Sequence, residues 1–236
     1  VLTMWSDYFD YRYALCRDTL FLKMRDESGA QYFFMPICDV ENGLELLREH
    51  CRETGDKLQF FGVGEEYVEL FCKRLNAKNP VELEKWADYL YDARALTELV
   101  GKKYNAKRNH INKFRKTYPQ AEFKDFKKAY REKVLAFLEK YSKNDLTASY
   151  FYDKNEVSLL VENWRDGEYP AGYMEIDGEA VGFTVGDIVG DTLFVHVEKC
   201  LRDISGVYEA TTNAFLKRHV TDCLLYTSPS PRDYAA

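Results

Sequence analysis

The sequence predicts an α+β protein that is built from two related units. Each half of the chain contains strands and helices that are followed by a strand, a glycine and one more helix. The turn sequences Asp177-Gly178 and Gly190-Asp191 separate three candidate strands in the second half, and such pairs are strong signals for β-hairpins. Hydrophobic residues form 46% of the 236 residues and aromatic residues 15%, which is sufficient for a sizeable core.

In the first half, aromatic and aliphatic runs between polar turns predict strands, and apolar residues at helical spacing predict helices. The expected strands are residues 11–16, 19–24, 31–37, 57–63 and 86–91, and the expected helices are residues 40–53 and 64–75. The first helix should end at Gly55, and the acidic residues Glu65 and Glu66 favour the start of the second.

The second half begins with a segment that should be mostly helical, over residues 93–116. An amphipathic helix is expected over residues 123–141, because its apolar residues recur at helical spacing. The remaining expected elements are a helix at 157–164, strands at 172–176, 179–188 and 192–198, and a final helix at 206–218.

A basic segment interrupts a chain that is acidic as a whole. The formal net charge is -6, yet Gly101 to Lys116 contains seven Lys and Arg residues and no Asp or Glu. Such a patch concentrates anions near the protein, so the expected partner is anionic or phosphate-bearing. The ordinary alternative is a basic helix face that serves only solvation.

Within this segment, Lys107 falls inside a stripe of apolar residues at helical spacing. The stripe consists of Leu96, Val100, Tyr104, Ile111 and Phe114. A lysine on a buried face needs a carboxylate partner or a wet cavity, or it extends its amine out of the stripe to water. Gly101 and Asn105 weaken the helix and favour a kink there.

Two long blocks resemble a bacterial family of unknown function that is related to the C-terminal catalytic domain of phosphatidylglycerol lysyltransferase. The first block is KKYNAKRNHINKFRKTYP, preceded by DYLYD and LTELVGKKY, and the second is HVEKCLRDISGVYEATTNAFLKRH. The stretches VLTMWSDYFDYRYAL and YFFMPI match in character. Together they extend from Val1 to about residue 220.

The resemblance implies a tandem pair of GNAT-like acyltransferase units. Such a unit continues with further strands after the final helix, and a polar Asn-Arg-Glu type cluster in the next strand has no match here, so the second unit is expected to be truncated. The related lysyltransferases use aminoacyl-tRNA as donor, and they carry a membrane domain. No run of about 18 apolar residues is present, so no transmembrane helix is expected in this chain.

The basic segment then supplies the candidate donor site. The residues expected to bind an anionic donor are Lys102, Lys103, Lys107 and Arg108, with polar contacts from Asn109, His110 and Asn112. Aromatic residues interleave with these charges, which suits contact with tRNA, although the pI of about 5.4 and the absence of a nucleic-acid-binding motif argue against a general nucleic-acid binder.

The turn before the final helix is a second candidate anion site. Free backbone N–H groups at a helix start favour anions, and Gly206 would permit close backbone approach. The acetyl-CoA version of this loop is Arg/Gln-x-x-Gly-x-Gly/Ala. Arg202 is followed here by three other residues and a single glycine, so acetyl-CoA binding is not supported. The alternative is an ordinary helix capped by Asp203 or Ser205.

Glu198 is the candidate catalytic residue, because a carboxylate at the end of a central strand is placed to act as a general base. Lys199 must then point to the other face of the sheet. Asp187 is a second candidate carboxylate, and an exposed Glu198–Lys199 ion pair is the alternative. No structural metal is expected, since the His and Cys residues lack ligand spacing, and scattered cysteines favour reduced thiols in the cytoplasm.

The expected divisions are residues 1–92 for the first unit, 93–222 for the basic segment and second unit, and 223–236 for a tail. The tail CLLYTSPSPRDYAA resembles translated sequencing-adapter read-through, so we expect it to make few long-range contacts. Because the chain starts at Val1 in aromatic, core-like residues, it is expected to be a fragment.

The functional expectation is transfer of an acyl or aminoacyl group from a phosphate-bearing donor to an amine or hydroxyl acceptor such as a lipid head group. The alternatives are a non-catalytic anion- or ligand-binding protein of the same fold and an acyl-CoA N-acyltransferase.

Overall fold

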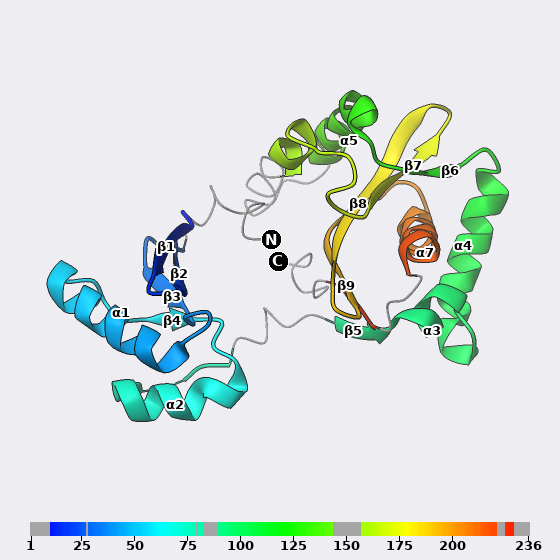
Figure 1. The fold of residues 1–236 in the computed structure, drawn as a ribbon. Helices are drawn as coiled ribbons and strands as arrows, with labels where there is room; N and C mark the ends of the chain where they lie inside the picture. Colours follow the sequence, from blue (N-terminus) through cyan, green and yellow to red (C-terminus); the bar gives the residue numbers. More distant parts are fainter. Residues whose placement is uncertain are drawn as a thin grey trace. The chain divides into compact units, whose positions relative to one another are not determined.

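A computed structural model describes residues 10–26, 28–78, 80–82, 89–143, 157–220 and 225–228. The chain divides into two compact units, Val1–Glu82 and Leu83–Ala236 (Figure 1). We expected the division at residue 92. The difference arises because strand β5 (Tyr89–Asp92) pairs within the sheet of the second unit.

The first unit contains a four-stranded sheet in the order β1-β2-β3-β4, with two helices. Its strands are β1 (Arg12–Cys16), β2 (Thr19–Arg25), β3 (Gln31–Phe34) and β4 (Phe60–Phe61), and its helices are α1 (Val40–Thr54) and α2 (Glu65–Leu75). The expected elements are confirmed apart from their bounds, because the strands predicted at 31–37 and 57–63 are shorter.

Helix α1 begins and ends as its sequence predicts. The Asp39 side chain accepts a hydrogen bond from the Asn42 amide at 3.1 Å, and Gly55 ends the helix in the left-handed conformation. Leu47 and Cys51 on the predicted apolar face pack with Phe21 and Phe33 of the sheet.

The second unit contains a six-stranded sheet in the order β5-β10-β9-β8-β7-β6. Its remaining strands are β6 (Glu122–Asp125), β7 (Ala171–Ile176), β8 (Glu179–Val189), β9 (Thr192–Cys200) and β10 (Leu225–Ser228). Helix α7 (Val207–His219) packs against β7, β8 and β9, whereas α5 (Arg131–Lys143) packs against β8 on the other side of the sheet (Figure 1). The predicted hairpin turns are confirmed, and both Asp177 and Gly178 have positive φ.

The segment that was expected to be one helix over residues 93–116 forms three short elements instead. These are α3 (Ala93–Glu98), the 3₁₀ turn η2 (Lys102–Tyr104) and α4 (Asn105–Thr117). The break lies where Leu99 and Gly101 have positive φ, so the expected kink near Gly101 is confirmed. Because of the break, Val100 leaves the apolar stripe and is 69% exposed.

The helix predicted over 123–141 is wrong in its first part. Residues 122–125 form strand β6 instead, which pairs with β7, and the 3₁₀ turn η3 (Lys128–Tyr130) precedes α5. Phe126 is buried, but Tyr130 is 40% exposed. The apolar spacing was compatible with a continuous helix, and only pairing with β7 selected a strand at its start.

The expectation of few long-range contacts in the tail is wrong for residues 225–228. Strand β10 pairs in parallel with β9 and antiparallel with β5, so it is an inner strand. Tyr226 is only 2% exposed. A strand therefore does follow the final helix, and the other residues of the predicted tail lie outside the described residues.

Helix α7 starts in close contact with α4. Gly206 has a φ of 81°, and a Cβ atom there would lie 2.5 Å from the His110 carbonyl oxygen. No side chain fits this space without moving the α4 backbone. The role of Gly206 in the fold is therefore to bring α7 and α4 together.

This contact predicts a large cost for Gly206→Ala. The control Gly178→Ala carries the positive-φ cost of about 1–2 kcal/mol without any contact, since no atom lies within 4 Å of a Cβ at that glycine. Gly206→Ala should lower the free energy of unfolding by roughly 2 kcal/mol more, because of the added clash with α4. Urea denaturation followed by circular dichroism measures both, and equal losses would contradict the packing role.

Candidate functional site

A pocket of about 180 Å³ lies in the second unit, against the end of β9. Its walls come from β5, β9, β10, α3, α4 and α7. The apolar and aromatic lining residues are Tyr91, Leu96, Leu99, Ile111, Tyr208, Leu216 and Tyr226. The polar and charged lining residues are Lys107, Glu198, Glu209, Thr212 and Asn213.

A β-bulge aims Glu198 into this pocket. Val185 pairs with Val197 and Gly186 pairs with Val195, so β9 contains one extra residue at His196. Leu193 and Val195 join the core beside α7, and simple alternation would turn Glu198 to the opposite face. The extra residue reverses the alternation, which is a common effect of bulges near functional sites.

The carboxyl group of Glu198 is partly buried among α7 side chains. Its Oε1 lies 2.5 Å from Thr212 Oγ1. Burial raises the pKa of Glu198 to about 7, and the negative charge of Glu209 adds a smaller rise. A hydrogen bond donated by Thr212 to the charged form and the positive charge of Lys107 act in the opposite direction. A carboxyl group with this pKa exchanges protons readily at neutral pH, as a general acid or base must.

Lys199 points away from this pocket, as the strand geometry predicts. Its side chain is 4% exposed, and its Nζ lies 5.4 Å from the centre of the Tyr141 ring of α5. The alternative of an exposed Glu198–Lys199 ion pair is therefore wrong. The other candidate carboxylate, Asp187, is absent from the pocket lining.

Glu209 is a second pocket carboxylate, which sequence reasoning missed. Its Oε1 lies 2.5 Å from His110 Nδ1, so the pair joins the first turn of α7 to α4. The His110 side chain is 54% exposed and that of Glu209 is 24% exposed, which places His110 toward solvent. His110 of α4 and Glu209 of α7 therefore link the two helices through their side chains.

Lys107 lines the pocket but remains exposed. Within the described residues, no carboxylate lies within the 4.0 Å of an ion pair with its amine. The expectation of a buried or carboxylate-paired Lys107 is wrong, and its amine extends to water at the pocket margin. The positive charge of Lys107 still favours the charged form of Glu198, and it therefore lowers the pKa of that carboxyl group.

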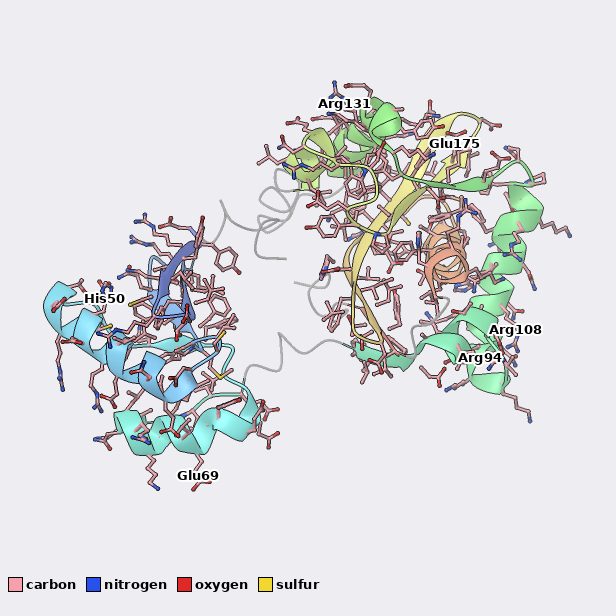
Figure 2. All side chains as sticks on the ribbon, viewed as in Figure 1. His50, Glu69, Arg94, Arg108, Arg131 and Glu175 are labelled. Carbon is pink, nitrogen blue, oxygen red and sulfur yellow. The ribbon has the colours of Figure 1, made fainter. Side chains whose placement is uncertain are left out.

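Arg108 has a structural position at the junction of α3 and α4 (Figure 2). Its guanidinium donates hydrogen bonds to the Leu99 and Gly101 carbonyl oxygens and to Asn105 Oδ1. These N–H donors satisfy carbonyl oxygens that the break after α3 leaves without a helical partner. Arg108 therefore holds the turn that positions Lys107, and most of its donors are engaged there.

The other predicted donor-binding residues lie outside the pocket lining. Lys102, Lys103, Asn109 and Asn112 are all exposed. Lys103 Nζ lies 4.9 Å from the centre of the Tyr104 ring. The α4 backbone packs against Gly206, since an added Cβ atom there would lie 2.5 Å from the His110 carbonyl oxygen. Gly206 is itself the N-cap of α7, without a side-chain cap from Asp203 or Ser205.

Three further pocket residues, Tyr208, Asn213 and Leu216, belong to the second sequence block. Tyr208 donates a hydrogen bond to the Glu198 carbonyl oxygen at 2.8 Å, and Asn213 donates one to the Thr97 carbonyl oxygen at 2.8 Å. The spacing of residues 209, 212, 213 and 216 places them on one face of a helix. This helical spacing is the sequence signal that could have identified these pocket residues. It points to a site only when Glu198 is known to face α7.

A family model described as "Phosphatidylglycerol lysyltransferase, C-terminal" matches residues 1–226. A search of curated proteins finds no match. Within the described residues, no helix combines the length and the hydropathy needed to cross a bilayer.

Several solved structures have a similar fold. A conserved protein of unknown function from Bacteroides thetaiotaomicron is 25% identical, with a TM-score of 0.86, and the match covers 96% of this chain and 79% of that one. L-PGS from Bacillus licheniformis is 11% identical, with a TM-score of 0.65 and coverage of 93% and 68%.

A third similar structure is the C-terminal domain of a putative lysylphosphatidylglycerol synthetase from Agrobacterium fabrum. It is 10% identical, with a TM-score of 0.60, and the match covers 94% of this chain and 71% of that one. The expected tandem GNAT-like α+β fold is confirmed.

The partly buried Glu198 carboxyl group predicts how stability depends on pH. Its pKa in the folded protein is about 7, against an ordinary value of 4.5, so the folded state holds the proton more tightly than the unfolded state. The stability of the wild type therefore falls as pH rises from about 4.5 through 7. Glu198→Gln removes this loss, and its stability relative to wild type should increase by up to about 3 kcal/mol between pH 4.5 and pH 8.

Urea denaturation at both pH values measures the difference. Glu162→Gln is the matched control, because Glu162 is exposed and outside the pocket. It should show the same stability relative to wild type at both pH values. A Glu198→Gln effect that does not change with pH would contradict the proposed burial of the carboxyl group.

Proposed function

The chain belongs to the family of the phosphatidylglycerol lysyltransferase C-terminal domain, and on that premise we propose that it transfers an aminoacyl group from a phosphate-bearing donor to an amine or hydroxyl acceptor. The observation that carries this proposal is the position of Glu198. Its carboxyl group lies in the pocket, and the pKa of that group is near neutrality. Aminoacyl transfer requires proton movement between the acceptor and the leaving oxygen, and such a group can provide it.

The donor in this proposal is aminoacyl-tRNA. Helix α4 and the turn before it expose Lys102, Lys103, Lys107, Lys113, Arg115 and Lys116. These charges lie outside the pocket except for Lys107, which lies at its margin. The arrangement suits an RNA whose phosphates contact α4 while its aminoacyl end enters the pocket beside Glu198.

The acceptor in this proposal is a lipid head group that carries a hydroxyl or an amine. The support is the family relationship, since similar structures include L-PGS and a putative lysylphosphatidylglycerol synthetase. An acyl-CoA donor fits less well. The loop before α7 lacks the glycine pattern of coenzyme A binding, and the α4 backbone packs against Gly206, where an added Cβ atom would lie 2.5 Å from the His110 carbonyl oxygen.

The first test measures RNA binding as a function of salt. Affinity for aminoacyl-tRNA should fall steeply as salt rises, because contacts with phosphates release counterions. The double variant Lys102→Ala, Lys107→Ala should bind several-fold more weakly, and its salt slope should be smaller by about 1–2. Filter binding at several salt concentrations gives both quantities.

The matched control is Lys127→Ala, Lys128→Ala, which removes the same charge from exposed positions at the start of η3. It should retain the wild-type slope. Calorimetry with coenzyme A is the second arm of the test. Absence of tRNA binding at low salt together with coenzyme A binding would replace the proposal with an acyl-CoA enzyme.

The second test is catalytic. Glu198→Gln should reduce aminoacyl transfer to a hydroxyl or amine acceptor by about 10²–10⁴-fold, because the amide cannot exchange a proton. Binding of aminoacyl-tRNA should remain within about twofold of wild type. Release of labelled amino acid from tRNA into the acceptor measures transfer. RNA binding with no turnover in the wild type would favour a non-catalytic binding protein.

A further inference from the structure

The hydroxyl group of Thr212 lies between two oxygen atoms. Its Oγ1 is 2.5 Å from Glu198 Oε1 and 2.9 Å from the Tyr208 carbonyl oxygen. Tyr208 precedes Thr212 by four residues in α7, so this carbonyl belongs to the preceding helical turn. Both oxygen atoms are close enough for a hydrogen bond with the hydroxyl group.

One hydroxyl hydrogen cannot fully serve both oxygen atoms. A threonine hydroxyl has one donor hydrogen and two acceptor lone pairs, and in a helix it commonly donates to the carbonyl four residues earlier. If Thr212 donates to Tyr208, its lone pairs face Glu198. Two lone-pair-bearing oxygens at 2.5 Å require a hydrogen between them, and the carboxyl group is then its source.

The surroundings of Glu198 agree with a neutral carboxyl group. The titratable groups that face it are Lys107 from α4, Glu209 and Tyr208 from α7, Tyr91 from β5, Tyr226 from β10 and Cys200 from its own strand. Lys107 is the one cation among the described groups that line the pocket, and it is exposed, whereas Glu209 adds negative charge. Burial among phenols and aliphatic side chains disfavours the charged form of a carboxyl group.

We propose that Glu198 is protonated in the resting protein and that Thr212 is the positioning residue that holds this proton, by accepting it at Oγ1 while donating to Tyr208. The chemical consequence rests on the proposed function. Glu198 then begins the reaction as a general acid, rather than as the general base that the sequence suggested.

The proton balance of the transfer follows from this state. The ester bond between the aminoacyl carbon and the donor oxygen breaks, its electron pair goes to that oxygen, and the oxygen takes the proton of Glu198. The acceptor nitrogen or oxygen forms the new bond to the aminoacyl carbon and passes its proton to the Glu198 carboxylate. Glu198 ends the cycle protonated, as it began.

The opposite hydrogen-bond direction makes an opposite prediction for Thr212. If Thr212 donates to a Glu198 carboxylate, removing the hydroxyl group destabilises the charged form and raises the pKa of Glu198. If Thr212 accepts from protonated Glu198, removing it destabilises the neutral form and lowers that pKa. The sign of the change therefore separates the two directions.

The experiment is a ¹³C NMR titration of the Glu198 side-chain carboxyl group in the full chain, with the resonance assigned through bonds. Thr212→Ala should lower the pKa of Glu198 by roughly half a pH unit to one pH unit, the equivalent of one hydrogen bond. Thr212→Ser retains the hydroxyl group and should titrate as wild type does. An unchanged or raised pKa in Thr212→Ala overturns the proposal.

The wild type alone supplies a second measurement that does not depend on a variant that folds. At pH 6 its Glu198 carboxyl resonance should have the chemical shift of a protonated carboxylic acid, and the shift of a carboxylate would overturn the proposal. Neither measurement requires turnover. If the protein transfers no aminoacyl group but Glu198 titrates as expected, the proposed function fails and the protonation state stands. If transfer occurs with Glu198 charged at pH 6, the proposed function stands and this inference fails.

Discussion

The pocket depends on the close approach of two helices, α4 and α7, at Gly206. A side chain at this position would meet the His110 carbonyl oxygen, so the helices can touch only where a hydrogen replaces a Cβ atom. This contact brings Glu209 to His110 and places the α4 residues Lys107 and Ile111 at the pocket that Glu198 enters. Residues about one hundred positions apart in the chain therefore share one site because two backbones meet without an intervening side chain.

The bulge in β9 adds a second constraint, because it decides which face of the sheet receives Glu198. Without the extra residue at His196, Glu198 would turn toward the α5 side, where Lys199 now lies beside Tyr141. The bulge thus places the carboxyl group on the α7 side of the sheet, in contact with Thr212. Burial of an ionisable group is unfavourable for its charged form, and the same cost produces the raised pKa that proton transfer at neutral pH requires.

The charges of the second unit are separated by role. The exposed lysines of α4 face solvent, where an anionic partner can reach them, whereas the two carboxylates line the pocket. Arg108 belongs to neither group, because its guanidinium donates to carbonyl oxygens where α3 ends. A basic residue within a basic motif can therefore be structural, and its neighbour Lys107 gains its place at the pocket margin from that structural contact.

The sequence by itself determined the elements with strong local signals. Gly55 and Asp39 set the ends of α1, the Asp177-Gly178 turn set the β7–β8 hairpin, and Glu198 was identifiable as a carboxylate at a strand end. These features follow from the conformational preferences of single residues and from alternation along a strand. The tertiary structure alone decided that residues 122–125 form a strand and that β10 lies inside the sheet, because strand pairing depends on distant partners. It also decided that Glu198, Glu209 and Thr212 meet, because a bulge and a helix contact have no local signature strong enough to read from the chain.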